Sequence, residues 1–174
     1  MKRWIGRAMV AALVAACADQ APSPTEGGAP SLSASGAVPA TVFNTQLRGE
    51  LESPISTSES KGHAQIKVFQ DGTIESVVII NNKGGETVRF GHIHHLNPAS
   101  ATGPVIWWLT SPTLTNLMLT DRHLDFRQQA AFVANTHFAT HEDAVAALLA
   151  DPSSFYVNFH SDAFTGGFAR GFLR

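Results

Sequence analysis

The pentapeptide Gly91-His92-Ile93-His94-His95 contains the residues of this chain that are best suited to do chemistry. The surrounding sequence is typical of a β-strand, in which side chains at positions i and i+2 project from the same face. His92 and His94 are therefore predicted to point the same way, with Ile93 on the opposite face. Two parallel imidazoles form half of a transition-metal site.

A third histidine ends the segment Phe155-Tyr156-Val157-Asn158-Phe159-His160, which also has the pattern of a strand. Tyr156 and Asn158 are predicted to share the face of His160. Together with His92 and His94, His160 would supply three nitrogen ligands, which suits copper or zinc. The His-x-His pair is also similar to the copper motif of copper/zinc superoxide dismutase, which is itself a β-sandwich.

The alternative role for these histidines is structural. In that case His92, His94 and His160 form hydrogen bonds with backbone carbonyls or with Asn158, and they hold adjacent strands together without any ion. We favour this structural role, because motif spacing alone never shows that three groups converge on one point. Both roles stay open from the sequence.

Further predictions concern residues around these motifs. Arg170 is expected to pair with Glu50 or Glu52 and so to hold the last strand to the first. Trp107 and Trp108 are adjacent in a strand, so one is expected in the core and the other in solvent or under the insertion that follows. Three other histidines are expected at the surface: His141 in the first turn of a helix, and His123 and His137 in the insertion.

The N-terminus has the pattern of an export signal. Basic residues at Lys2, Arg3 and Arg7 precede the apolar run 8–16, which is too short to span a bilayer. Cys17 is the chain's only cysteine, and its position after small residues resembles the lipobox of bacterial lipoproteins. We therefore expect a lipoprotein signal peptide at 1–16, a lipid anchor on Cys17, a flexible Ala/Ser/Pro/Gly-rich tether over 17–41, and one domain over 42–174.

Charge and composition exclude several function classes. Removal of residues 1–16 takes away three of the twelve Lys and Arg and none of the fourteen Asp and Glu, which changes the formal charge from −2 to −5. Such a balance argues against nucleic-acid binding. The chain has no Gly-x-Ser-x-Gly elbow, and Gly84-Gly85 lacks the lysine of a phosphate-binding loop. A non-enzymatic role is therefore favoured.

Short apolar runs separated by turn signals fill the rest of the chain. Strands are expected at 42–51, 63–69, 73–80, 86–94, 104–109, 155–160 and 168–173, and a helix capped by Thr140 at 144–149. The segment 120–134 is expected to be a short helix or an irregular insertion. This pattern predicts an all-β fold, an antiparallel β-sandwich with one or two short inserted helices.

These segments together resemble the CHRD domain, named for chordin, over about residues 42–174. The motifs that carry the resemblance are Leu47-Arg48-Gly49, Glu52-Ser53-Pro54, Gly62, Gly91-His92-Ile93-His94, Gly103-Pro104-Val105, Leu109, Tyr156-Val157-Asn158-Phe159-His160 and Gly167-Phe168-Ala169-Arg170-Gly171. The closing segment departs from the family pattern at Phe168, Ala169 and Phe172, and the insertion 111–140 is long. The resemblance implies an extracellular β-sandwich.

Two functions follow as hypotheses. The first is a binding module anchored at the bacterial cell envelope, on the outer membrane or a periplasm-facing membrane surface. Its contacts would be the membrane through Cys17 and an exported protein or glycan. The second is a copper or zinc protein, either a carrier or a dismutase-like redox enzyme, that uses His92, His94 and His160.

Overall fold

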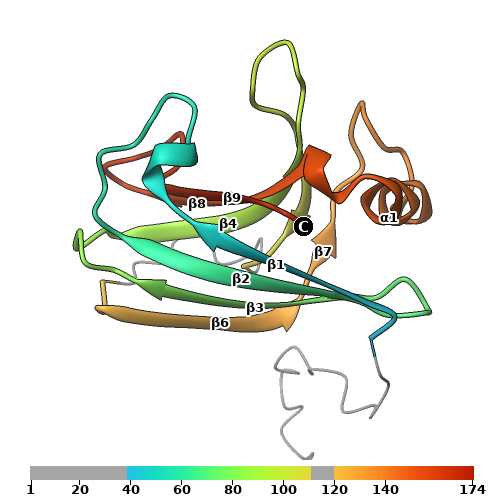
Figure 1. Ribbon diagram of the computed structural model, residues 1–174, viewed down its shortest axis with the longest axis horizontal. Coiled ribbons are helices and arrows are strands. Elements are labelled where there is room, and N and C mark those ends of the chain that lie inside the picture. Colours follow the sequence, from blue (N-terminus) through green and yellow to red (C-terminus); the bar gives the residue numbers. More distant parts are fainter. Residues whose placement is uncertain (1–38, 111–119) are drawn as a thin grey trace, which may run out of the picture.

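Two antiparallel β-sheets packed face to face form the domain in the computed structural model, which describes residues 39–110 and 120–174 (Figure 1). The predicted all-β sandwich is confirmed. The expected signal peptide, Cys17 and most of the tether lie outside the described residues. The strands are β1 (Thr41–Leu47), β2 (Lys61–Val68), β3 (Ile74–Asn81), β4 (Val88–His95), β5 (Val105–Trp108), β6 (His123–Gln129), β7 (Ala131–Phe132), β8 (Phe155–Ser161) and β9 (Ala169–Phe172).

The order of strands places β4 and β8 side by side in the middle of one sheet. That sheet has the order β7-β5-β4-β8-β9, and the other has the order β1-β2-β3-β6. Across the β4–β8 pair, His92 lies opposite Asn158 and His94 lies opposite Tyr156. On the other side of β4, His92 lies opposite Trp108 of β5. The register therefore gathers the motifs singled out from the sequence onto neighbouring strands.

Alternation along the central strands separates a core face from an outer face. Ile93, Val157 and Phe159 belong to the buried apolar core between the sheets. Phe159 contacts Phe126 of the opposite sheet, with ring centroids 5.2 Å apart. Gly91 gives that ring its space, because a Cβ there would lie 2.4 Å from it. His92, His94 and His160 consequently project from the outer face of the five-stranded sheet.

Two segments differ from the expected secondary structure. The segment 120–134 contains strands β6 and β7 instead of a helix or an irregular insertion. β6 and β3 pair along their length, so β3 is not an unpaired edge of its sheet. The first strand ends at Leu47 rather than Leu51, and a short 3-10 helix, η1 (Gly49–Leu51), turns the chain toward Glu52.

Helix α1 (His141–Ala150) lies at one end of the sandwich (Figure 1) and is followed by a second 3-10 helix, η2 (Pro152–Ser154). Thr140 caps it as predicted, accepting a hydrogen bond from the Asp143 amide. The prediction that His141 is an exposed surface residue is wrong. It is half-buried, accepts a hydrogen bond from Nε1 of Trp107 at 3.2 Å, and bonds the Gly72 carbonyl through Nε2 at 2.9 Å.

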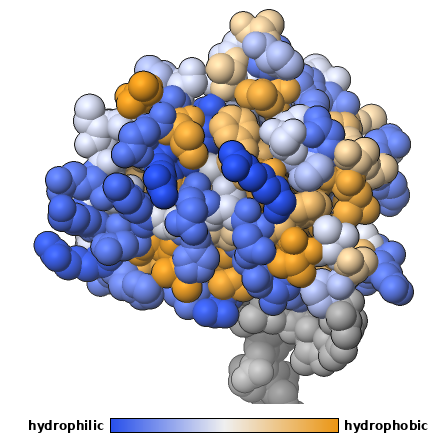
Figure 2. All heavy atoms as spheres, viewed as in Figure 1, coloured by the Kyte–Doolittle hydropathy of each residue, from blue (hydrophilic) through white to orange (hydrophobic). Residues whose placement is uncertain are grey.

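Large hydrophobic side chains on the described surface are scattered. Those that are exposed are Val42, Leu51, Ile55 and Leu149. On the face shown in Figure 2, hydrophobic residues lie among hydrophilic ones. Among the described residues, no helix is both long and apolar enough to cross a membrane.

Candidate metal centre

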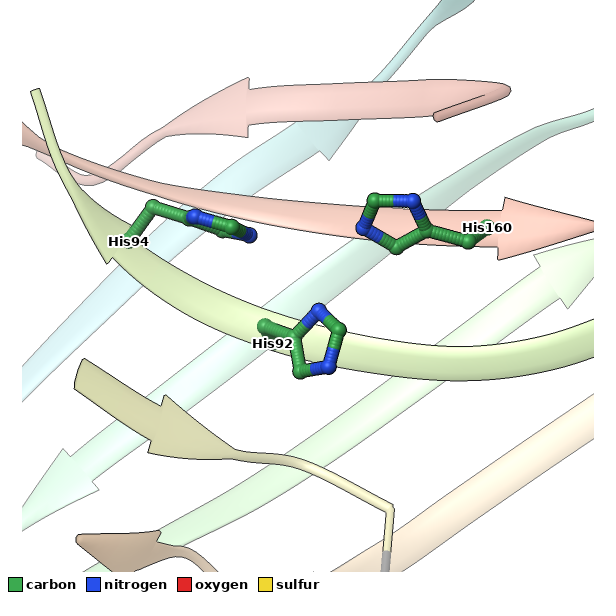
Figure 3. Close-up of side chains that lie close together, drawn as sticks. All are labelled: His92, His94 and His160. Carbon is green, nitrogen blue, oxygen red and sulfur yellow. The ribbon is translucent and has the colours of Figure 1, made fainter. Parts of the chain in front are cut away.

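The three histidines singled out from the sequence converge on one point of the outer sheet face. His92 and His94 come from β4 and His160 from β8, and their rings point toward a shared space (Figure 3). One ring nitrogen from each lies within 4.8 Å of the others. A common ion at bond lengths near 2 Å requires separations of about 3–4 Å, so the rings need to move inward by only about 1 Å to bind one.

These side chains are buried although they do not face the sandwich core. His92 is 4% exposed, His94 is 8% and His160 is 9%. The loop after β4 and the loop after β8 flank the histidines, because Gly103 and Thr165 in these loops contact the ring nitrogens of His94 and His160. A ligand bound between the three rings would therefore be largely removed from water.

Backbone carbonyls orient two of the imidazoles. Nδ1 of His94 donates to the Gly103 carbonyl oxygen at 2.8 Å, and Nδ1 of His160 donates to the Thr165 carbonyl oxygen at 2.8 Å. A proton on Nδ1 leaves the lone pair on Nε2, which is the tautomer that binds a metal. Metal-ligating histidines commonly have this second hydrogen bond to a carbonyl.

The remaining nitrogens of the cluster are buried and have no hydrogen-bond partner among the described residues. They are Nε2 of His94, Nε2 of His160 and both ring nitrogens of His92. A buried polar atom without a partner costs about 1–3 kcal/mol. The structural role therefore explains the two carbonyl contacts and leaves the other nitrogens, including all of His92, unexplained.

Asn158 does not bond the histidines, so of the two kinds of partner in the structural alternative only the backbone carbonyls are present. The Asn158 amide nitrogen donates instead to both oxygens of Glu52, at 2.9 and 3.2 Å. Arg170 also reaches this carboxylate, through Nε at 3.1 Å, which confirms the predicted pairing for Glu52 and not for Glu50. Burial raises the pKa of Glu52 to about 7, while the Arg170 guanidinium and the Asn158 amide oppose that rise.

A stack of side chains links this ion pair to the cluster. The Arg170 guanidinium lies 4.1 Å from the centre of the Tyr156 ring. The same ring stacks on His94, with centroids 4.9 Å apart and planes 2° from parallel. Tyr156 and Arg170 therefore pack in a stack against one face of the His94 ring.

Two aromatic residues that sequence reasoning did not assign to the site complete its surroundings. Phe90 lies 5.5 Å from His92 and 5.4 Å from His160, between ring centroids. Trp108 lies edge to face with His92 at 4.2 Å, whereas Trp107 is fully buried in the core. Phe90 was detectable, because it precedes His92 by two positions in the same strand. Trp108 required the register of β5 against β4.

Other histidines stay apart from the cluster. His95, next to His94 in β4, contacts the exposed His137 through their Nδ1 atoms at 2.8 Å. His63 and His123 are exposed on β2 and β6. The predicted surface positions of His123 and His137 are confirmed.

Burial keeps the three imidazoles neutral. Together with the nearby His160 and His94, it lowers the pKa of His92 from 6.5 to about 2. It lowers the pKa of His94 to about 4, against the opposing effect of the Gly103 carbonyl, and it also lowers the pKa of His160. The neutral form is the one that binds a metal ion.

The metal-free protein is expected to lose stability as the pH falls from about 7 to 5. Unfolded histidines bind protons below about 6.5, whereas the folded imidazoles stay neutral, so acid favours the unfolded state. His92 and His94 each cost about 2 kcal/mol at pH 5, and His160 acts in the same direction. The raised pKa of Glu52 acts in the opposite direction between about 7 and 4.5, but it is one group against three.

Urea unfolding at several pH values measures this dependence. The His92→Phe substitution should reduce the slope of the free energy of unfolding against pH. The His63→Ala substitution, at an exposed position, should leave that slope unchanged. Equal stability at pH 7.5 and pH 5 would show that these imidazoles are not held neutral.

Comparison with known proteins gives one finding. A family model described as the CHRD domain matches residues 43–173. No curated protein and no solved structure matches the chain.

Proposed function

The chain belongs to the CHRD domain family, and from that fold and its buried histidine cluster we propose that it binds one copper or zinc ion through His92, His94 and His160. The observation that carries the proposal is the set of unpartnered, buried nitrogens that face one another. Two of the rings are already fixed in the tautomer that a metal needs. A role as a non-enzymatic metal-binding module or carrier fits this arrangement best.

The site supports one ion rather than two. Among the described residues, no other His, Cys, Asp or Glu joins the three histidines in a cluster able to hold a metal. A dinuclear centre of the dismutase kind needs a bridging ligand and further donors. We therefore propose a site for a single ion, which the three imidazoles would hold.

Metal titration tests this proposal. Protein stripped with a chelator is expected to bind one equivalent of copper or zinc. His160→Ala should weaken binding about 100-fold or more, because it removes a ligand, while His123→Ala changes an exposed histidine of β6 and should bind as the wild type does. Sub-stoichiometric binding by the wild type, or equal loss in both variants, would contradict the proposal.

We also propose that Cys17 anchors the protein at the bacterial cell envelope. The basic n-region, the short apolar run and the small residues before Cys17 support lipidation at that position. The acyl chain would then be the contact with the membrane, on the outer membrane or a periplasm-facing surface. The domain would stand away from the lipid on the tether.

Replacement of Cys17 by serine tests the anchor. The wild type is expected in the membrane fraction, with a mass increase on its N-terminal peptide that matches an acyl modification. Cys17→Ser should lack that mass and move to the soluble exported fraction or remain uncleaved. Unmodified Cys17 in a membrane-free wild-type protein would overturn the anchor.

A further inference from the structure

The charge of the donor set carries information about which ion the site takes. All three candidate ligands are imidazoles, which bind a metal in their neutral form, and among the described residues no carboxylate or thiolate belongs to the cluster. A bound ion would therefore keep its full charge in a buried place. The nearest carboxylate discussed above, that of Glu52, is already paired with Arg170 and Asn158.

We propose that the site selects monovalent copper, Cu(I), over divalent ions such as Zn(II) and Cu(II). This inference rests on the proposed function, because it concerns the same three histidines. It goes beyond that function by assigning the charge and identity of the ion.

Desolvation is the first argument for a single charge. The cost of moving an ion from water into a low-dielectric interior grows with the square of its charge, so a divalent ion costs about four times as much as a monovalent ion of equal size. The site is 4–9% exposed at its three ligands. None of the described ligands carries a negative charge that would offset the second positive charge of a divalent ion.

Arg170 adds to this discrimination. Its guanidinium lies 4.1 Å from the centre of the Tyr156 ring, and that ring stacks on His94, so a positive charge lies one side chain away from the cluster. The potential of this charge repels a divalent ion twice as strongly as a monovalent one. Glu52 offsets part of this effect and leaves the site without a net negative charge.

Coordination number is the second argument. Structural and catalytic zinc sites have four ligands, with water or a carboxylate completing three histidines. Here the rings of Phe90, Trp108 and Tyr156 lie against the cluster, and apart from the phenol oxygen of Tyr156 they offer no fourth ligand. Three-coordinate binding by imidazoles alone suits Cu(I).

Competition with chromophoric chelators, done anaerobically with reductant for Cu(I), measures the affinities for Cu(I), Cu(II) and Zn(II). The wild type is expected to bind Cu(I) at least about 1000-fold more tightly than Zn(II), and more tightly than Cu(II). Phe90→Asp places a carboxylate beside His92 and His160. It should raise the Zn(II) affinity and lower the ratio of the Cu(I) affinity to the Zn(II) affinity about 10-fold or more. Phe90→Leu keeps the site apolar and is the matched control.

The outcomes separate the two proposals. Binding of Zn(II) or Cu(II) as tightly as Cu(I) would overturn the inference and leave metal binding standing. Binding of none of the three ions would overturn metal binding itself. If Phe90→Asp does not fold, Trp108→Glu introduces the carboxylate from β5 and should shift the ratio in the same direction.

Discussion

Replacement of Arg170 by methionine is expected to lower the free energy of unfolding by about 3–5 kcal/mol, because it leaves the Glu52 carboxyl group buried without the cation and hydrogen-bond donor that it faces. Arg170 is 2% exposed, and its Nη1 also donates to the Ala101 carbonyl oxygen at 2.8 Å. Methionine keeps much of the length of the side chain, so the loss reports the missing charge and hydrogen bonds more than a cavity. Chemical denaturation measures the change.

Two comparisons isolate the ion pair. The double variant Glu52→Gln, Arg170→Met has no orphaned charge and should recover part of the lost stability. Arg89→Met breaks the ion pair of Arg89 with Asp162, which is partly exposed to solvent, and should cost less than about 1 kcal/mol. A similar small loss for Arg170→Met would show that the buried pair does not hold β9 and η1 together.

The second large effect concerns His92, whose two ring nitrogens are buried and unpartnered. Phenylalanine at this position is expected to stabilise the metal-free protein by about 1–3 kcal/mol, because it removes polar atoms that have lost water and gained no hydrogen bond. The same variant should lose the stabilisation that a metal gives. That stabilisation is about 4 kcal/mol when the free metal is about 1000 times its Kd.

The signs distinguish the two roles of the histidines. A residue kept for metal binding stabilises the protein only when the ion is present, so His92→Phe gains stability without metal and loses it with metal. A residue kept to join strands gives a loss in both conditions. Thermal denaturation with and without the ion gives all four values, and His92→Leu is the alternative if phenylalanine is too large for the space.

The local pattern was sufficient to predict the strands that carry the site. Alternation placed His92 and His94 on one face and Ile93 in the core, and it placed Tyr156, Asn158 and His160 together. The helix cap at Thr140 was also predicted, because capping depends on neighbours in sequence. These features depend on the period of the strand or on a single turn.

Features that depend on distant pairing were not predictable in this way. The sequence of β6 is mixed and charged, and its strand conformation depends on pairing with the edge of β3. Trp108 reaches His92 through the β4–β5 register. The carbonyl groups of Gly103 and Thr165, which fix two imidazole tautomers, belong to loops whose positions no sequence period encodes.

The position of the cluster separates the candidate metal site from the apolar core. The apolar core lies between the two sheets, and the histidines lie on the opposite face of β4 and β8. The sheet fixes the backbone positions of all three imidazoles through β4–β8 pairing. The polar nitrogens can therefore stay unpartnered without interrupting the core, at a cost confined to the outer face.

Anomalous X-ray diffraction from crystals of the metal-loaded protein tests the central claim most directly. We predict one peak at the metal's absorption edge, about 2 Å from Nε2 of His94, from Nε2 of His160 and from a ring nitrogen of His92. A peak at the His95–His137 pair instead, or no peak between the three histidines at full metal loading, would contradict the account.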